Sequence, residues 1–148
     1  MGDGIDLHVT VLLADAAQVA DGKLFILGAG ISSIGAGPHP LGVAILIDVP
    51  WDRANIRHLW QLELVDEDGT PVMANDRPVL VGGDFEAGRP PGLQPGTPLS
   101  VPIAVNFSGL PVQAGHSYQF RLAVDGTTEG DWSARFGVRP AVAAPTDD

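Results

Sequence analysis

Apolar and polar residues alternate along most of the chain, which is the period of a β-strand with one buried face. The first alternating run places one set of apolar side chains on a single face: Ile5, Leu7, Val9, Val11 and Leu13. Turn-forming residues separate the later runs, which cover residues 23–31, 41–49, 58–64, 71–73, 79–85, 99–107, 118–124 and 132–138. No window of ten or more residues keeps a helical period, although residues 12–20 allow one turn of helix. The pattern predicts an all-β domain of about eight or nine short antiparallel strands.

Glycine and proline refine the expected arrangement of the strands. Asp21 and Gly22 form a two-residue pair suited to a hairpin turn. The run 23–31 is apolar on both faces and contains Gly28 and Gly30, so we expect a central strand with a bulge or a close backbone approach. Pro102 lacks a backbone donor, which predicts that strand 99–107 lies at a sheet edge or carries a bulge.

One local sequence resembles the tyrosine corner of fibronectin type III and related Greek-key domains, whose pattern is Leu-x-Pro-Gly-Thr-x-Tyr. Here it reads Val112-Gln113-Ala114-Gly115-His116-Ser117-Tyr118 and departs from the pattern at Val112 and Ala114. The resemblance implies a hydrogen bond between the Tyr118 hydroxyl and nearby backbone. We therefore expect an immunoglobulin- or fibronectin-like β-sandwich, in which Tyr118, Gly115 and the turn glycines have structural roles. Those turn glycines are Gly22, Gly69 and Gly126.

The predicted core follows from the alternating faces. It consists of Val9, Val11, Ile45, Ile47, Leu62, Leu64, Ile103, Val105, Phe120, Leu122 and Phe136.

A second resemblance spans nearly the whole chain. Leu13-Ala14-Asp15, followed by Gly22-Lys23-Leu24 and then Gly28, resembles the opening of a bacterial family of small proteins with no assigned function. The similarity continues through Pro50-Trp51, residues 66–69, Pro90-Pro91-Gly92, Leu110, Tyr118 and residues 132–138. This resemblance implies a β-sandwich, and it supplies no catalytic or ligand-binding residues.

Length and composition indicate one globular domain, residues 1–140, followed by an acidic disordered tail, residues 141–148. A net charge of -10 argues against nucleic acid as a partner, because binding its phosphates requires Lys and Arg. The chain has no cysteine, which excludes disulfides and thiolate metal sites. No apolar run is long enough for a membrane helix, and the first residues are acidic where a signal peptide is basic. We therefore expect a cytoplasmic protein without membrane attachment. One Lys against seven Arg in an Ala- and Gly-rich chain favours a bacterial source.

The sequence offers no catalytic, cofactor-binding or metal-binding residues. The four histidines lack metal-ligand spacing, no serine stands in Gly-x-Ser-x-Gly, and Gly28-Ala29-Gly30 is followed by no helical pattern. We expect His58 to be a partly buried, hydrogen-bonded residue rather than a base. Two acidic segments, residues 66–69 and residues 125–131, contain the Asp-Gly pairs that are typical of turns, and this is sufficient to explain their composition. The alternative is a Ca²⁺ site built from both turns, which requires them at one end of the sandwich.

One loop has the composition of a binding surface. Trp51 follows Pro50 and is accompanied by the polar residues Asp52, Arg53 and Asn55. The favoured interpretation is that Trp51 folds back as a lid over one end of the sandwich. The alternative is ligand contact, together with the Pro- and Gly-rich loop that runs from Glu86 to Pro98.

These observations favour a non-enzymatic interaction or structural module whose partner is unknown. The alternatives are a small-ligand or carbohydrate-binding module that uses the two loops, and a hydrolase whose site is assembled only in space. With 45% hydrophobic and 18% charged residues, the chain has little polar surface. We expect a homodimer that covers an apolar face, although the loop around Leu93 offers an intrachain cover for the same face.

Overall fold

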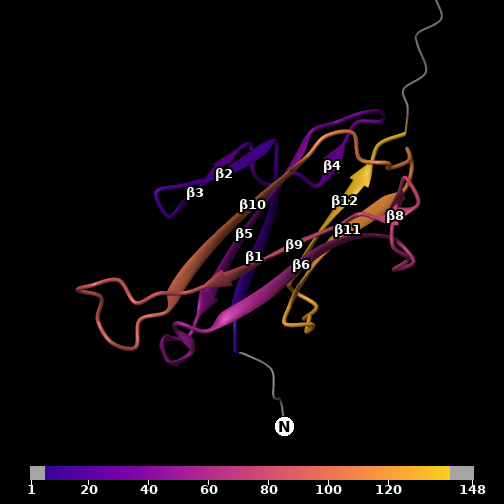
Figure 1. Ribbon diagram of the computed structural model, residues 1–148. Helices are drawn as coiled ribbons and strands as arrows, with labels where there is room; N and C mark the ends of the chain where they lie inside the picture. The colour runs from indigo at the N-terminus through magenta and orange to yellow at the C-terminus, as the bar shows by residue number, and fades with distance from the viewer. Residues whose placement is uncertain (1–5, 141–148) are drawn as a thin grey trace, which may run out of the picture.

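The computed structural model describes residues 6–140 and confirms the predicted all-β fold, a sandwich of two sheets (Figure 1). The three-stranded sheet has the order β1 (His8–Ala14), β5 (Leu41–Val49), β10 (Leu99–Phe107). The five-stranded sheet has the order β4 (Ser33–Ile34), β12 (Ser133–Val138), β11 (Ser117–Val124), β6 (Arg57–Asp66), β9 (Leu80–Glu86). Two separate hairpins are β2 (Ala16–Ala20) with β3 (Lys23–Leu27) and β7 (Met73–Ala74) with β8 (Arg77–Pro78). A single 3-10 turn, η1 (Trp51–Arg53), follows β5.

The core lies between the two sheets, where the alternating apolar residues meet. Ile45 is fully buried and is flanked in register by Val11 on β1 and Ile103 on β10. From the opposite sheet, the Phe120 ring stacks between Phe107 and Phe136, with centroid distances of 5.2 Å and 5.9 Å. Every residue predicted for the core belongs to this buried cluster, except that Val105 packs against it partly buried.

The two outer faces of the sandwich differ in chemistry. The outer face of the five-stranded sheet carries charged side chains, among them Arg57, Glu63 and Arg121. The outer face of the three-stranded sheet carries small or apolar residues at its centre, where Leu12, Ala44 and Ala104 lie in one register row. The outer face of the three-stranded sheet is therefore the less polar of the two.

The β2–β3 hairpin lies against this apolar outer face, and we call it the arm (residues 16–27). A side chain added at Gly42 would place its Cβ 2.9 Å from the Cα of Ala16, so only glycine lets the arm approach β5 this closely. The Asn106 side chain of β10 fastens the arm, because its amide donates to the Ala17 carbonyl at 2.8 Å and accepts from the Ala17 N–H at 3.0 Å. Figure 1 shows the arm, in indigo, to one side of the two main sheets.

One expectation about this region is wrong. The run 23–31 does not form a central strand, because β3 ends at Leu27 and pairs only with β2 among the described residues. The chain bends at Asp15, whose N–H donates to the Leu27 carbonyl, and Gly28 turns away with a φ of +69°. Residues 12–20 also contain no helical turn, since they form the end of β1 and the whole of β2.

Other features agree with the sequence pattern. Strand β10, which contains Pro102, is an edge strand, as proline requires. Asp21 and Gly22 form the β2–β3 turn, both with positive φ. The short strands β4 and β8, of two residues each, were not predicted. No helix in residues 6–140 is long and apolar enough to cross a membrane. Ile5 and the predicted tail, residues 141–148, lie outside the described part of the chain.

Candidate functional site

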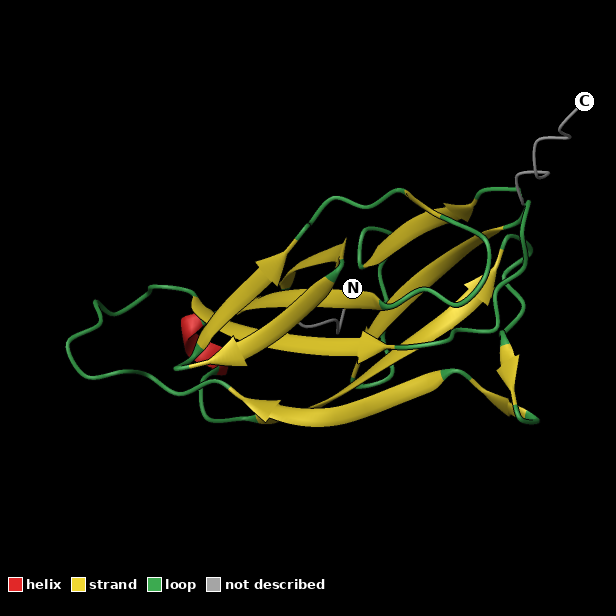
Figure 2. Ribbon diagram, turned by 90° about the horizontal axis from the view of Figure 1, so that it is seen from above, coloured by secondary structure: helices red, strands yellow, loops and turns green. Residues whose placement is uncertain are grey.

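Trp51 lies at one end of the sandwich and is partly buried against the core. The Arg89 guanidinium lies 4.5 Å from the centre of its ring and donates to the Trp51 carbonyl at 2.6 Å. Figure 2 shows the 3-10 turn and the long loop at this same end. Trp51 thus covers the sandwich end, and the loop 86–98 is fastened to it.

A pocket of about 600 Å³ opens beside this tryptophan. Trp51 and Asp52 line it, whereas Arg53 and Asn55 do not. Asn55 has a φ of +61° and donates its N–H to the Ala87 carbonyl, which is a turn role. The remaining lining residues come from the chain before β1, from β1, from the end of β5 and from the loop before β10: Asp6, His8, Asp48, Pro50, Gly96 and Pro98.

His8 and Asp48 belong to this pocket although no sequence motif joins them. They face each other in the β1–β5 register, with His8 Nδ1 3.7 Å from Asp48 Oδ2. Ser100 donates its hydroxyl proton to Asp48 Oδ1 at 2.8 Å. The order Ser–Asp–His differs from a catalytic triad, in which histidine stands between the serine and the carboxylate. Within residues 6–140, no three His, Asp or Glu side chains lie close enough together to hold a metal ion.

A second His–carboxylate pair joins a buried histidine, His58, to an exposed carboxylate, Asp125. His58 is 2% exposed, packs against the Phe85 ring at 5.1 Å and bonds Asp125 through Nδ1 at 2.7 Å. Burial raises the pKa of Asp125, but the hydrogen bonds from His58 and from the Leu59 N–H outweigh this and hold that pKa below its usual value. The Nε2 atom of His58 is buried and has no hydrogen-bond partner among the described residues. The pair joins the start of β6 to the end of β11.

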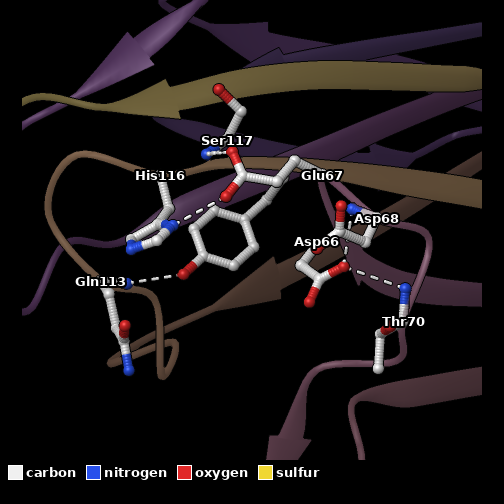
Figure 3. A network of polar contacts seen from close by, with 8 residues as sticks. Asp66, Glu67, Asp68, Thr70, Gln113, His116 and Ser117 are labelled. Carbon is white, nitrogen blue, oxygen red and sulfur yellow. Dashed lines mark hydrogen bonds and ion pairs between the residues drawn. The ribbon is translucent and has the colours of Figure 1, made fainter.

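The predicted tyrosine-corner hydrogen bond is present, and Figure 3 shows it. The Gln113 N–H donates to the Tyr118 hydroxyl oxygen at 2.8 Å, and Gly115 turns the intervening loop with a φ of +82°. Glu67 fastens the same loop, because its carboxylate bonds His116 Nδ1 at 2.7 Å and accepts from the Ser117 N–H. The hydrogen bond from His116, aided by the Ser117 N–H, lowers the pKa of Glu67.

The acidic turns cannot form a joint Ca²⁺ site. Asp66 pairs with Tyr118 at one end of β11, whereas Asp125 lies beyond the opposite end and donates its N–H to the Leu59 carbonyl. Asp66 Oδ1 also accepts from the N–H groups of Asp68 and Thr70, so this carboxylate closes its own turn (Figure 3). Gly69 and Gly126, each with a φ of +80°, complete the two turns.

The arm carries several exposed large apolar side chains. Leu27 is 70% exposed, Phe25 53% and Val19 41%, and Leu12 of the adjoining β1 is 39% exposed. Residues 16–20 and 24–31 contain no charged side chain. The loop 86–98 does not cover this face, because Leu93 packs against the core and the loop lies at the Trp51 end. The alternative of an intrachain cover by the loop around Leu93 is therefore wrong, and the arm stays exposed within the described chain.

The chain belongs to a family of unknown function, DUF6941, whose model matches residues 9–136. The match covers both sheets and the arm. No curated protein matches the chain.

Proposed function

We propose that the protein is a non-enzymatic interaction module that binds an extended, uncharged strand of a protein partner along the free edge of β3. The observation that carries this proposal is the chemistry of that edge. Exposed strand edges offer unpaired N–H and C=O groups, and soluble proteins normally protect them with proline, charges or very short strands. Strand β3 has none of these protections between Leu24 and Leu27.

Three of the four edge strands of the two main sheets do have them. Edge strand β9 carries Asp84 and Glu86, and Asp84 forms an ion pair with Arg57. Edge strand β10 contains Pro102, and its Asn106 is already bonded to the arm. Edge strand β4 is only two residues long. Edge strand β1 lacks these protections, but the Leu13 carbonyl at its end already accepts the N–H groups of Gly30 and Ile31. An added strand therefore meets unprotected edges at β1 and β3, and we assign the binding to β3 because it carries the exposed Phe25 and Leu27.

The Ala17 contacts define which backbone groups of β3 are available. Both the N–H and the C=O of Ala17 point away from β3, since both are bonded to Asn106. Residues directly opposite each other in an antiparallel pair turn their groups the same way, either both inward or both outward. Ile26, which faces Ala17, and Leu24, which faces Val19, therefore direct their N–H and C=O groups to the free edge.

A labelled peptide tests this proposal. The probe carries the four residues Leu-Phe-Ile-Leu between polar flanks of Gln and Lys, and its fluorescence anisotropy is measured as the full-length protein is added. We expect saturable binding, weakened at least tenfold by Leu24→Pro, which removes one outward N–H and leaves the net charge and the exposed Phe25 and Leu27 unchanged. The matched control is Leu80→Pro, at an exposed apolar residue of edge strand β9. Its N–H likewise points away from the neighbouring strand, because Leu80 faces Glu63 at the same alternation as Leu59 faces Asp84, and Leu59 directs its own groups to Asp125. Equal binding by the wild type and Leu24→Pro would refute strand addition at this edge.

A second candidate function rests on the pocket beside Trp51. We propose that it takes a small ligand, since it joins an indole, three carboxylates and the ends of the two loops singled out in the sequence. Titration with monosaccharides and with choline, followed by heat denaturation, tests this. A bound ligand raises the midpoint in the wild type and not in Trp51→Ala, whereas an unchanged midpoint for every ligand excludes these classes.

We do not propose the hydrolase alternative, because in the Ser100–Asp48–His8 contacts the serine donates to the aspartate and not to the histidine, and the hydrogen bonds of the His58–Asp125 pair within residues 6–140 include no serine or threonine hydroxyl. We further propose a bacterial, cytoplasmic location, supported by the cysteine-free composition and the Arg-, Ala- and Gly-rich sequence. Localisation of a tagged chain in its host tests this.

A further inference from the structure

We infer that the strand received by β3 is β3 of a second copy of this chain, paired antiparallel about a two-fold axis at Phe25. This inference rests on the proposed strand-pairing function and specifies its partner. The resulting dimer contains one continuous four-stranded ribbon, β2–β3 of one copy followed by β3–β2 of the other.

The register of β3 is self-complementary. With Phe25 opposite itself, Leu24 of each copy faces Ile26 of the other. These are the two residues whose N–H and C=O groups point to the free edge. Residues that exchange both backbone hydrogen bonds stand directly opposite each other in an antiparallel pair. The symmetric register therefore uses every outward backbone group between Leu24 and Ile26, and no outward group in that segment remains unpaired.

The side chains fit the same register. Phe25 meets Phe25 of the second copy at a non-hydrogen-bonded position, where side chains approach most closely and aromatic pairs stabilise the sheet. Lys23, the only charged residue of β3, faces Leu27 of the second copy, so no like charges oppose each other.

Charge favours a second copy of the arm over a charged partner segment. The chain carries a net charge of -10, but residues 24–31 carry none, so the free edge offers neither a carboxylate for a basic strand nor a cation for an acidic one. Charges elsewhere on the two copies repel, and salt screens this repulsion. Added salt should therefore tighten the dimer, whereas it weakens association driven by opposite charges.

Cysteine cross-linking tests the register directly, because the chain has no cysteine of its own. In the proposed dimer, the Cα atoms of the two Phe25 residues lie about 4.5 Å apart, which is within the range of a disulfide. Phe25→Cys should therefore form a disulfide-linked dimer of twice 15.4 kDa under mild oxidation. Leu27→Cys is the matched control, since the two Leu27 residues lie about 14 Å apart in this register. It is even more exposed than Phe25, so it should remain monomeric in a denaturing gel.

Light scattering of the unmodified protein provides an independent measurement. We expect a dimer whose dissociation constant falls as salt is added, a monomer for Phe25→Lys, and no change for Leu59→Lys. Equal cross-linking of the two cysteine variants would indicate random collision and overturn the inference. A monomeric wild type that still binds the Leu-Phe-Ile-Leu peptide would overturn self-pairing and leave the proposed function standing. Failure of both dimer and peptide binding would overturn both.

Discussion

Replacement of Tyr118 by Phe isolates the hydrogen bond of the tyrosine corner. The substitution removes one oxygen atom and keeps the ring, which is 5.7 Å from Phe136 and lies in the core. The oxygen accepts the Gln113 N–H at 2.8 Å, and this hydrogen bond is partly buried. The substitution should therefore remove the partner of one backbone donor, the Gln113 N–H, and leave the packing of the ring unchanged.

The expected cost follows from the fate of that donor. A typical intramolecular hydrogen bond contributes about 1 kcal/mol, and an N–H left dry and unpaired costs up to about 3 kcal/mol. Because the corner lies near the surface, beside the exposed Glu67–His116 pair, water can reach the Gln113 N–H in the variant. We expect a loss of about 1 kcal/mol, which lowers the midpoint of heat denaturation by about 2–4 °C in a chain of this size.

Urea denaturation followed by tryptophan fluorescence measures this loss. Gln113→Ala is the matched control, since it retains the backbone N–H and should leave the midpoint unchanged. If Tyr118→Phe left the midpoint unchanged as well, the hydroxyl would contribute nothing and the corner would be held by Glu67 and His116 alone. A loss well above 3 kcal/mol would instead indicate that ring packing had changed.

Three further predictions concern the stability of the protein at low pH and the attachment of the arm. In the folded protein the pKa of Asp125 lies below its usual value of 3.8, so ionised Asp125 stabilises the fold above that pH. This stabilisation is lost as the pH falls through the lower folded pKa. Between pH 6 and pH 3, the free energy of unfolding should therefore fall less in Asp125→Asn than in the wild type. Gly42→Val drives a side chain into the Ala16 backbone, so it should cost about 1–3 kcal/mol by overpacking and expose the arm to proteolysis, whereas Gly88→Val, in open space, should not. Asn106→Ala should speed amide exchange at Ala17 in a hydrogen-exchange experiment and leave exchange at buried Ile45 unchanged.

Alternation was sufficient to predict the longer strands of the main sheets, because each buries one face, but not the two-residue strand β4. Leu41–Val49 was predicted with its observed bounds, and its inward residues fill the core. The arm was misread for the same reason. Its run is apolar on both faces, which is typical of a central strand, but here one face packs on the three-stranded sheet and the other is exposed. Hydrophobic pattern cannot distinguish a buried face from an exposed apolar one.

The sites depended on contacts that no local pattern records. Trp51 and Asp52 were found from composition, but His8 and Asp48 join them only because β1 and β5 pair in one register. Similarly, His58 meets Asp125 from 67 residues away, after β6 and β11 have paired. The turns could be predicted from sequence because their residue preferences are local. Asp21, Gly22, Gly69 and Gly126 all adopt the positive φ that their sequences indicate.

Asn106 determines which edge of the arm a partner can use. A two-stranded hairpin has two edges, and each could accept a strand. The Asn106 amide satisfies the outward N–H and C=O of Ala17, as a neighbouring strand would, so the β2 edge is occupied at its centre. The same two hydrogen bonds fix the arm on the sheet, which lowers the entropy that a partner must remove on binding. One side chain thus protects one edge, pre-organises the other, and leaves β3 as the side of the arm where a strand can be added.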